Sequence, residues 1–286
     1  MKYAAFTLAL LAGVPLMAGL ALWRPRYGAV LLGLLVFSTV MGDRANINFI
    51  SLEAYRGPDR GFEVNLTDLT ALAMALVLLV RHPRRVRWLP YNSLWMAGFF
   101  GVALLSTLMA PVPLLGWFSV VKLAKAYLIF WVVANALRAG ITPRAIWAGC
   151  AVAGLYLAAS AFHQKYVDGL YRVHGPFDHS NSIPLYTNLI LPVLLFWSLA
   201  DRELPRWASR AGTVIALGMA FAVVATMSRA GIALMGLMLA GALVVAHRRA
   251  RSRRVTATAV LVGLAALAGG IVASDSLLDR VRNAPE

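Results

Sequence analysis

Charged residues and cysteine are scarce in this sequence of 286 residues. Only 14% of the residues are charged and 60% are hydrophobic, and the mean hydropathy is +0.72. Soluble domains have about 25% charged and about 45–50% apolar residues, so this composition excludes a typical soluble protein. The single Cys150 excludes an intrachain disulfide and a paired-cysteine metal motif. The composition therefore predicts an all-α, polytopic integral membrane protein without a separate soluble domain.

Apolar segments of membrane-spanning length recur along the whole chain. The first follows Lys2 and has no convincing small-residue cleavage site, which favours an uncleaved span over a signal peptide. No internal repeat is evident in the sequence. We predict a single multi-spanning membrane domain over residues 1–286 with about ten spans, at residues 4–22, 27–42, 66–80, 92–109, 115–137, 145–162, 183–200, 211–227, 230–246 and 255–273.

Acidic residues are the scarcest charged group, with 12 against 27 lysines and arginines. Most of the cations lie in one alternate set of loops, which contains only two acidic residues, Asp201 and Glu203. Basic loops mark the cytoplasmic side of a membrane protein, so the net charge of +15 does not indicate a nucleic acid partner. The other side, which includes both termini and two substantial loops at 43–65 and 163–182, is predicted to be external. The cytoplasmic cations are Arg24, Arg26, Arg81, Arg84, Arg85, Arg87, Arg138, Arg144, Arg202, Arg206, Arg210, Arg248, Arg249, Arg251, Arg253 and Arg254.

Two lysines interrupt the predicted span 115–137 where no acidic residue is expected beside them. Lys122 and Lys125 are three residues apart and share one helical face. Measured from Trp117 at the outer interface, they lie about 7 to 12 Å inside. Asp68, at an outer helix end, is the nearest candidate partner. Two interpretations remain open: the ammonium groups snorkel to the surface, or they bind an external anion such as a lipid diphosphate.

The tetrapeptide Ser228-Arg229-Ala230-Gly231 interrupts an apolar run over residues 211–246 that is too long for one span. Two helices joined by a tight turn, with Gly231 easing the bend, are the simplest prediction. Arg229 then lies at the tip, at the external surface. It is either a polar turn residue or a phosphate ligand, because its rigid fork suits two phosphate oxygens and the next backbone amides point at the same anion.

The external loop 163–182 concentrates polar side chains around the turn signal Gly175-Pro176, namely Arg172, His174, Asp178, His179 and Asn181. The histidines and Asp178 match metal-site spacings poorly, and we predict no metal and no cofactor. One interpretation is a polar re-entry loop whose Asn181 and Ser182 cap the next helix. The other is a substrate loop, in which Arg172 is a second phosphate clamp, Asn181 contacts the substrate, and His174 or His179 is an auxiliary acid or base.

Two motifs together resemble a known family. The segment Tyr171-Arg172-Val173-His174-Gly175-Pro176-Phe177 through Asn181 and Leu191-Pro192, followed by Met227-Ser228-Arg229-Ala230-Gly231, is similar to the O-antigen ligase and O-antigen polymerase superfamily. The exosortase-associated O-glycosylation ligases are the branch it resembles, and the resemblance covers about residues 90–282. It implies a metal-independent, inverting glycosyltransferase in the bacterial cytoplasmic membrane. The partners implied are an undecaprenyl-diphosphate-linked glycan and a lipid or protein acceptor on the periplasmic side.

The resemblance also assigns roles. The arginine that matches Arg229 is expected to bind the diphosphate, and a histidine in a large external loop is expected to act as general base. No residue of this chain matches that histidine, so we expect the large loop and the last spans to follow Glu286 in an apparently truncated sequence. Without them, His174 or His179 would have to substitute.

Two other classes of function stay open. Lysines within a span and a helix broken by Pro184 and Pro192 also mark transporters of anionic or lipid-linked substrates. No pair of matching interrupted spans in two halves supports that interpretation. The chain is alternatively an inactive fragment or a structural subunit of an envelope-assembly complex.

Overall fold

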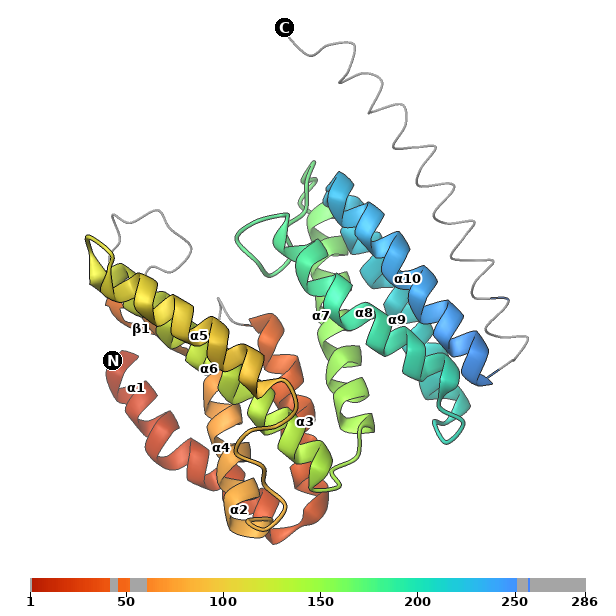
Figure 1. Cartoon of the computed structure of the whole chain (residues 1–286). Helices are drawn as coiled ribbons and strands as arrows, with labels where there is room; N and C mark the ends of the chain where they lie inside the picture. Colours follow the sequence, from red (N-terminus) through yellow and green to blue (C-terminus); the bar gives the residue numbers. More distant parts are fainter. Residues whose placement is uncertain (1, 42–45, 52–60, 251–256, 258–286) are drawn as a thin grey trace, which may run out of the picture. The chain divides into compact units, whose positions relative to one another are not determined.

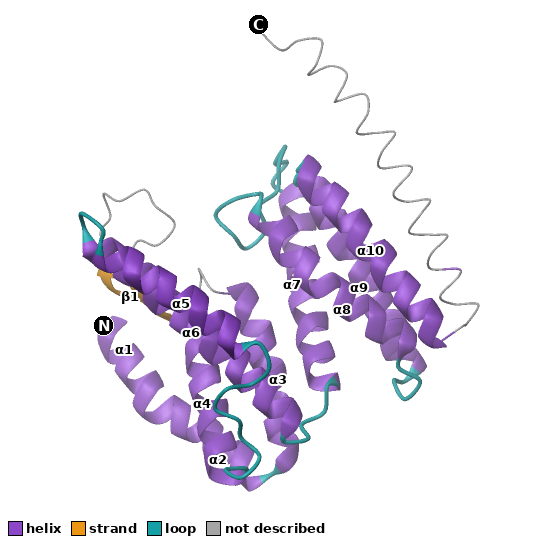
Figure 2. Cartoon of the chain, viewed as in Figure 1, coloured by secondary structure: helices purple, strands orange, loops and turns teal. Residues whose placement is uncertain are grey.

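The computed structural model describes residues 2–41, 46–51, 61–250 and 257. These residues are almost entirely helical, with one two-stranded antiparallel sheet (Figures 1 and 2). Packing divides the chain into two compact units, residues 1–149 and 150–286, which are described in turn. Helix α7 (Arg144–Tyr166) begins in the first unit and ends in the second.

Six helices among the described residues are long and apolar enough to cross a membrane. The prediction of an all-α, multi-pass membrane protein is therefore confirmed, whereas the count of about ten spans is not shown. The predicted span at 255–273 lies outside the described residues, apart from residue 257. The six candidate spans are Phe6–Trp23, Pro113–Arg138, Arg144–Tyr166, Ser182–Ala200, Arg206–Ala225 and Arg229–Arg249, and two shorter apolar segments are Pro25–Met41 and Ser93–Leu108.

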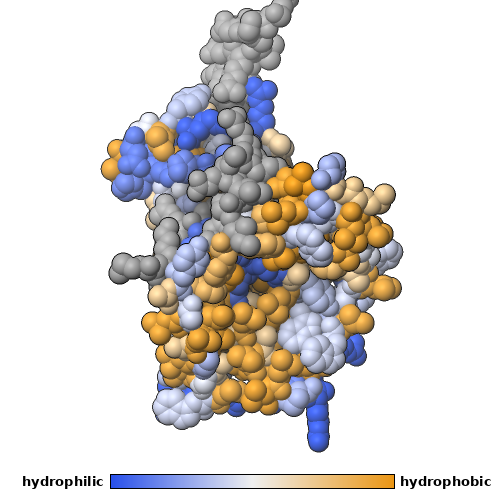
Figure 3. All heavy atoms as spheres, turned by 90° about the vertical axis from the view of Figure 1, so that its left-hand side faces the viewer, coloured by the Kyte–Doolittle hydropathy of each residue, from blue (hydrophilic) through white to orange (hydrophobic). Residues whose placement is uncertain are grey.

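Large apolar side chains cover the outer faces of these helices. On α5 (Ser93–Leu108), Leu94 is 83% exposed and Trp95 is 81% exposed. The face of the first unit in Figure 3 is coloured mostly hydrophobic for the same reason. Contiguous apolar surfaces of this kind mark contact with a membrane or a partner, and the long apolar helices favour the membrane.

The first unit is organised around α4 (Leu66–Arg81), which packs against α2 (Val14–Trp23), α3 (Pro25–Ser38) and α6 (Pro113–Arg138). Its core is mostly aliphatic, with Leu32, Leu35, Met74 and Leu78 among its members, and also contains Trp131. The remaining elements of the unit are α1 (Lys2–Leu8), the π-helix η1 (Ala9–Gly13), the 3-10 helix η2 (Thr39–Met41), β1 (Asn46–Ser51) and β2 (Gly61–Asn65).

The small sheet lies in the region predicted as an external loop at 43–65, where the sequence analysis expected no strands. β1 pairs with β2 from Asn46 opposite Asn65, with an irregularity in the register between Asn48 and Ile50. Phe62 of β2 packs edge-on against buried Phe118 of α6, with 4.8 Å between ring centroids. This contact attaches the sheet to α6. Residues 43–45 and 52–60 of the same loop lie outside the described residues.

The second unit is organised around α8 (Ser182–Ala200), which packs against both α9 (Arg206–Ala225) and α10 (Arg229–Ala250). Helix α7 lies against α9, where a side chain at Gly154 would meet Met219 and Ile215. Pro192 lies inside α8 and has no N–H to donate to the preceding turn.

The α9–α10 turn confirms the two predicted helices but corrects the role of Gly231. The left-handed residue of the turn is Met227, with φ of 56°. Gly231 is already helical, and a Cβ there would overlap the ring carbons of Pro184 on α8. The glycine is therefore needed for close approach of two helices, and not for the bend.

A similar contact yields the first prediction. A Cβ at Gly149 on α7 would lie 2.5 Å from the carbonyl oxygen of Gly33 on α3, and this oxygen cannot move without the helix. We expect Gly149→Val to destabilise the protein by about 1–3 kcal/mol through overpacking. The measurement is the midpoint of thermal unfolding in detergent.

The matched control is Gly98→Val on α5, where nothing lies within 4 Å of a new Cβ. Both variants carry the same change in helix propensity. Equal midpoints for the two variants would show that the α3–α7 contact does not limit packing.

Candidate functional site

Most of the predicted site residues gather at one end of the second unit. The end of α7, the loop 167–181, the start of α8 and the turn between α9 and α10 all meet there (Figure 1). By the arginine distribution this end is the predicted external side.

Gln164, near the end of α7, holds the loop in place. Its Oε1 accepts hydrogen bonds from the backbone N–H groups of His174 at 3.0 Å and Gly175 at 2.8 Å. Its Nε2 donates to the carbonyl oxygen of Gly175 at 2.9 Å. Gly175 has φ of 61°, which a side chain would strain. Gln164 is a functional residue that the sequence does not reveal, because a single amide at the end of a span belongs to no recognisable pattern.

The loop is also attached to the end of α9. Val173 is fully buried, and its N–H donates to the carbonyl oxygen of Ala225 at 3.4 Å. Arg172 Nε donates to the carbonyl oxygen of Thr226 at 3.0 Å, and Arg172 Nη2 donates to Asn181 Oδ1 at 3.5 Å. Arg172 and Asn181 are therefore brought together beside the turn that precedes Arg229.

Asn181 corrects one interpretation of this loop. It occupies the N-cap position of α8, but its side chain makes no capping hydrogen bond. Its amide oxygen accepts the bond from Arg172 instead. Capping by this side chain is thus wrong, and a polar role beside Arg172 remains.

Arg229 is the first residue of α10 and is exposed. Ser228 caps the helix, since its Oγ accepts from the N–H of Gly231 at 3.4 Å, and its own N–H donates to Thr226 Oγ1 at 3.2 Å. Within the described ranges, neither Arg172 nor Arg229 forms an ion pair with a carboxylate. Two guanidinium groups and a helix N-terminus thus lie at the same end, a combination that favours anions.

The two candidate histidines differ in their surroundings. His174 is half-buried, with Nδ1 2.6 Å from the carbonyl oxygen of Phe177 and Nε2 3.5 Å from Gln164 Nε2. The first contact fixes the proton on Nδ1, since a carbonyl oxygen only accepts. His179 is exposed, and its backbone carbonyl accepts from Ser182. In the part of the chain that the structure describes, no three His, Cys, Asp or Glu residues are placed to hold a metal ion.

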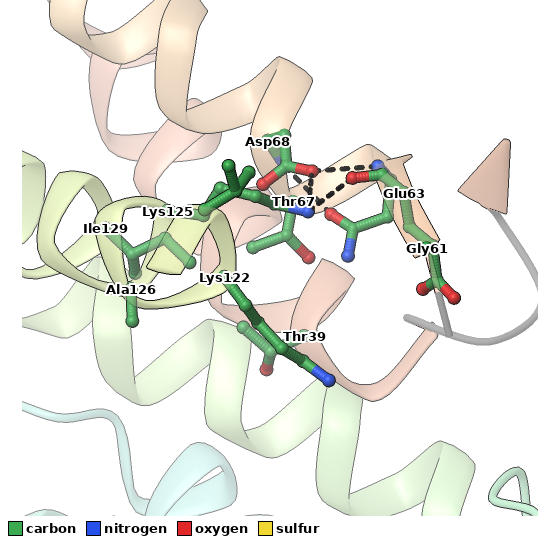
Figure 4. A pocket seen from close by; sticks show the side chains of 11 residues that line it. Thr39, Gly61, Glu63, Thr67, Asp68, Lys122, Lys125, Ala126 and Ile129 are labelled. Atoms are coloured by element: carbon green, nitrogen blue, oxygen red, sulfur yellow. Dashed lines mark hydrogen bonds and ion pairs between the residues drawn. The ribbon is translucent and has the colours of Figure 1, made fainter. Parts of the chain in front are cut away.

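Lys122 and Lys125 belong to the first unit and line a cavity of about 250 Å³ between β2, α4 and α6 (Figure 4). Lys125 Nζ lies 2.7 Å from Asp68 Oδ2 and donates to the carbonyl oxygen of Glu63, also at 2.7 Å. The expectation that these lysines lack a carboxylate neighbour is therefore wrong for Lys125. Lys122 extends past Thr39, away from this ion pair (Figure 4).

The position of Asp68 follows from local structure. Asn65 and Asp68 form a reciprocal capping box: Asp68 N–H donates to Asn65 Oδ1 at 3.0 Å, and Asn65 N–H donates to Asp68 Oδ2 at 2.9 Å. A carboxylate is stabilised at the N-terminus of a helix. Strand β2 leads directly into α4, so the cap places Asp68 against Lys125. Binding of an external anion by the two lysines stays a prediction.

Comparison of the chain with protein-family models, curated proteins and solved structures found no match.

The ion pair leads to a prediction about stability. Asp68→Asn removes the charge that compensates Lys125, and losing one partner of a buried pair costs about 3–5 kcal/mol. The side chain of Lys125 is 23% exposed, so we expect a smaller loss of about 2 kcal/mol. Thermal unfolding in detergent measures it. The double variant Asp68→Asn/Lys125→Met should recover most of the loss, and a double variant as unstable as the single one would contradict the pairing.

The role of Gln164 predicts how strongly the backbone amides of the loop 167–181 are protected from hydrogen exchange. Gln164→Leu removes the acceptor for two amides, and each hydrogen bond contributes about 1 kcal/mol. We expect exchange at the His174 and Gly175 amides to accelerate by about fivefold or more, as measured by hydrogen–deuterium exchange. Gln164→Glu keeps the acceptor oxygens and should retain most of the protection. Unchanged exchange in Gln164→Leu would mean that other contacts hold the loop.

Proposed function

We propose that this chain is a glycosyltransferase of the O-antigen ligase and polymerase type. It transfers a glycan from undecaprenyl diphosphate to a lipid or protein acceptor. The observation that carries the proposal is the anchoring of Arg172 to Thr226, which holds one guanidinium beside the turn that bears a second, Arg229. Two arginines at the same end of the second unit, without carboxylate partners in the described ranges, form a fitting receptor for a diphosphate.

The arginines would act on the leaving group. In an inverting transfer, the acceptor oxygen attacks the anomeric carbon from the face opposite the diphosphate. The bond between that carbon and the phosphate oxygen breaks, and negative charge develops on the departing diphosphate. Fixed guanidinium groups stabilise this charge without a metal ion. Asn181, held by Arg172, would orient the substrate beside them.

The acceptor hydroxyl must lose a proton to a base. Of the two histidines in the loop, the exposed ring of His179 is favoured, because both ring nitrogens of His174 contact Phe177 and Gln164.

The proposal includes the membrane topology. About ten spans would place this site on the periplasmic face of the bacterial cytoplasmic membrane. The described lysines and arginines of the second unit support that orientation, because only Lys165, Arg172 and Arg229 lie at the site end, whereas Arg202, Arg206 and Arg210 lie at the end where α8 leads into α9. The basic residues Arg248 and Arg249 lie at the opposite end of α10.

Binding of a donor analogue with a short prenyl chain tests the proposal. We expect full-length protein in detergent to bind farnesyl diphosphate, and Arg229→Gln to weaken binding by about tenfold or more, since a charge-assisted hydrogen bond contributes about 1.5–3 kcal/mol. Isothermal titration calorimetry measures both affinities.

Arg249→Gln is the matched control, because it removes the same charge from the same exposed helix at the other end. Farnesyl monophosphate is the matched ligand and should bind more weakly than the diphosphate. Equal affinity in Arg229→Gln and Arg249→Gln would exclude Arg229 as a diphosphate ligand.

A further inference from the structure

A second cationic cavity lies at the opposite end of the first unit, away from the Lys125–Asp68 pair. The α2–α3 junction, the segment after α4 and the α6–α7 connection meet there (Figure 1) and border an open cavity of about 390 Å³. Arg26, Arg81 and His82 line the cavity, and Ala21, Ala29 and Val77 supply apolar wall. The volume falls within the range of small-molecule pockets.

In the described part of the first unit, no carboxylate compensates these cations. None of the residues that line the cavity is acidic, and the sequences 23–26, 81–92 and 138–144 contain no aspartate or glutamate. In the described part of this unit, the carboxylates are Glu63 and Asp68. Asp68 lies in the first turn of α4 and His82 follows its last, so about 20 Å of helix separates them.

The arginines are positioned by backbone groups. Arg81 Nη1 donates to the carbonyl oxygens of Ala21 at 3.4 Å and Leu22 at 3.3 Å. Arg85 Nη1 donates to the carbonyl oxygen of Ala139 at 3.1 Å. These bonds join the end of α4 to the other two connections. They use one nitrogen of each guanidinium, which carries five N–H donors in total.

The electrostatic environment is positive. The pKa of His82 is lowered, first by burial and then by the charges of Arg85 and Arg81. A group whose protonation is opposed by two arginines reports a surplus of positive potential that an anion would relieve.

We propose that this cavity binds the headgroup of an anionic glycerophospholipid from the leaflet at the arginine-rich side of the membrane. Arg26 and Arg81 grip the phosphodiester, and the acyl chains run over the apolar wall and the exposed apolar helix faces. Basic pockets between spans on the cytoplasmic side bind anionic headgroups in this way. The site is independent of the proposed glycosyl transfer and lies in the other unit of the chain.

The test compares lipids that differ only in charge. Delipidated full-length protein in neutral detergent, at about 0.3 M salt to screen exposed charges, is titrated with phosphatidylglycerol or with phosphatidylcholine of the same acyl chains. The thermal unfolding midpoint reports binding. We expect phosphatidylglycerol to stabilise the protein at concentrations at which phosphatidylcholine does not.

Variants localise the effect. Arg26→Gln should weaken phosphatidylglycerol binding by about fivefold, and Arg26→Gln/Arg81→Gln by about 25-fold. The hydrogen bond and the ring contact of the Arg26 side chain in the described structure are both with neighbouring Tyr27, so the single variant tests binding even if loss of Arg81 impairs folding. Arg24→Gln/Arg84→Gln makes the same charge change outside the cavity and should shift affinity by less than about twofold.

Three results would overturn the proposal. Equal binding of phosphatidylglycerol and phosphatidylcholine would show that the site does not require an anionic headgroup. An equal loss of phosphatidylglycerol affinity in the two double variants would show that the lipid responds to surface charge and not to this cavity. Equal stabilisation by inorganic phosphate would identify a site for a free anion rather than a lipid.

Discussion

The hydrogen bond from Arg172 Nε to the carbonyl oxygen of Thr226 is the contact on which the proposed site depends. Arg172 lies in a loop, and a free arginine side chain would lose rotamer entropy whenever it bound an anion. Attachment to the α9–α10 turn removes part of that cost and fixes the guanidinium near the start of α10. Gln164 and buried Val173 hold the backbone of the same loop, so the cation is supported from α7 and from α9. An anchored cation binds a diphosphate at a lower entropic cost than a mobile one.

The helices were predictable because each is an apolar segment flanked by charged residues, glycine or proline. The spans expected at 145–162 and 183–200 correspond to α7 and α8, with boundaries that differ by a few residues. The small sheet was not predictable, since its strands are short and separated by residues of mixed polarity. The role of Gly231 was misread for a different reason. Its importance comes from Pro184, which is distant in the sequence and meets it only through the packing of α8 on α10.

The candidate site was predictable in part. Arg172, His174, Asn181 and Arg229 were selected from local chemistry, and the structure places them at one end of the second unit. Asp68 was named as the nearest candidate partner of the two lysines, but its pairing with Lys125 was not predicted, because the relative register of α4 and α6 decides which lysine it meets. A single sequence contains no information about register between helices. The cavity around Arg26 and Arg81 was not predicted for the same reason. Three connections that are distant in the sequence form it, and a single sequence does not show that they meet. Charge asymmetry identified its arginines only as markers of topology.

A structure of the full chain in lipid nanodiscs with a bound polyprenyl diphosphate would test the central claim most directly. The account predicts that the diphosphate oxygens lie within hydrogen-bond distance of both the Arg172 and the Arg229 guanidinium groups, with Asn181 beside them. A headgroup bound elsewhere on the chain, or one that contacts neither arginine, would contradict it.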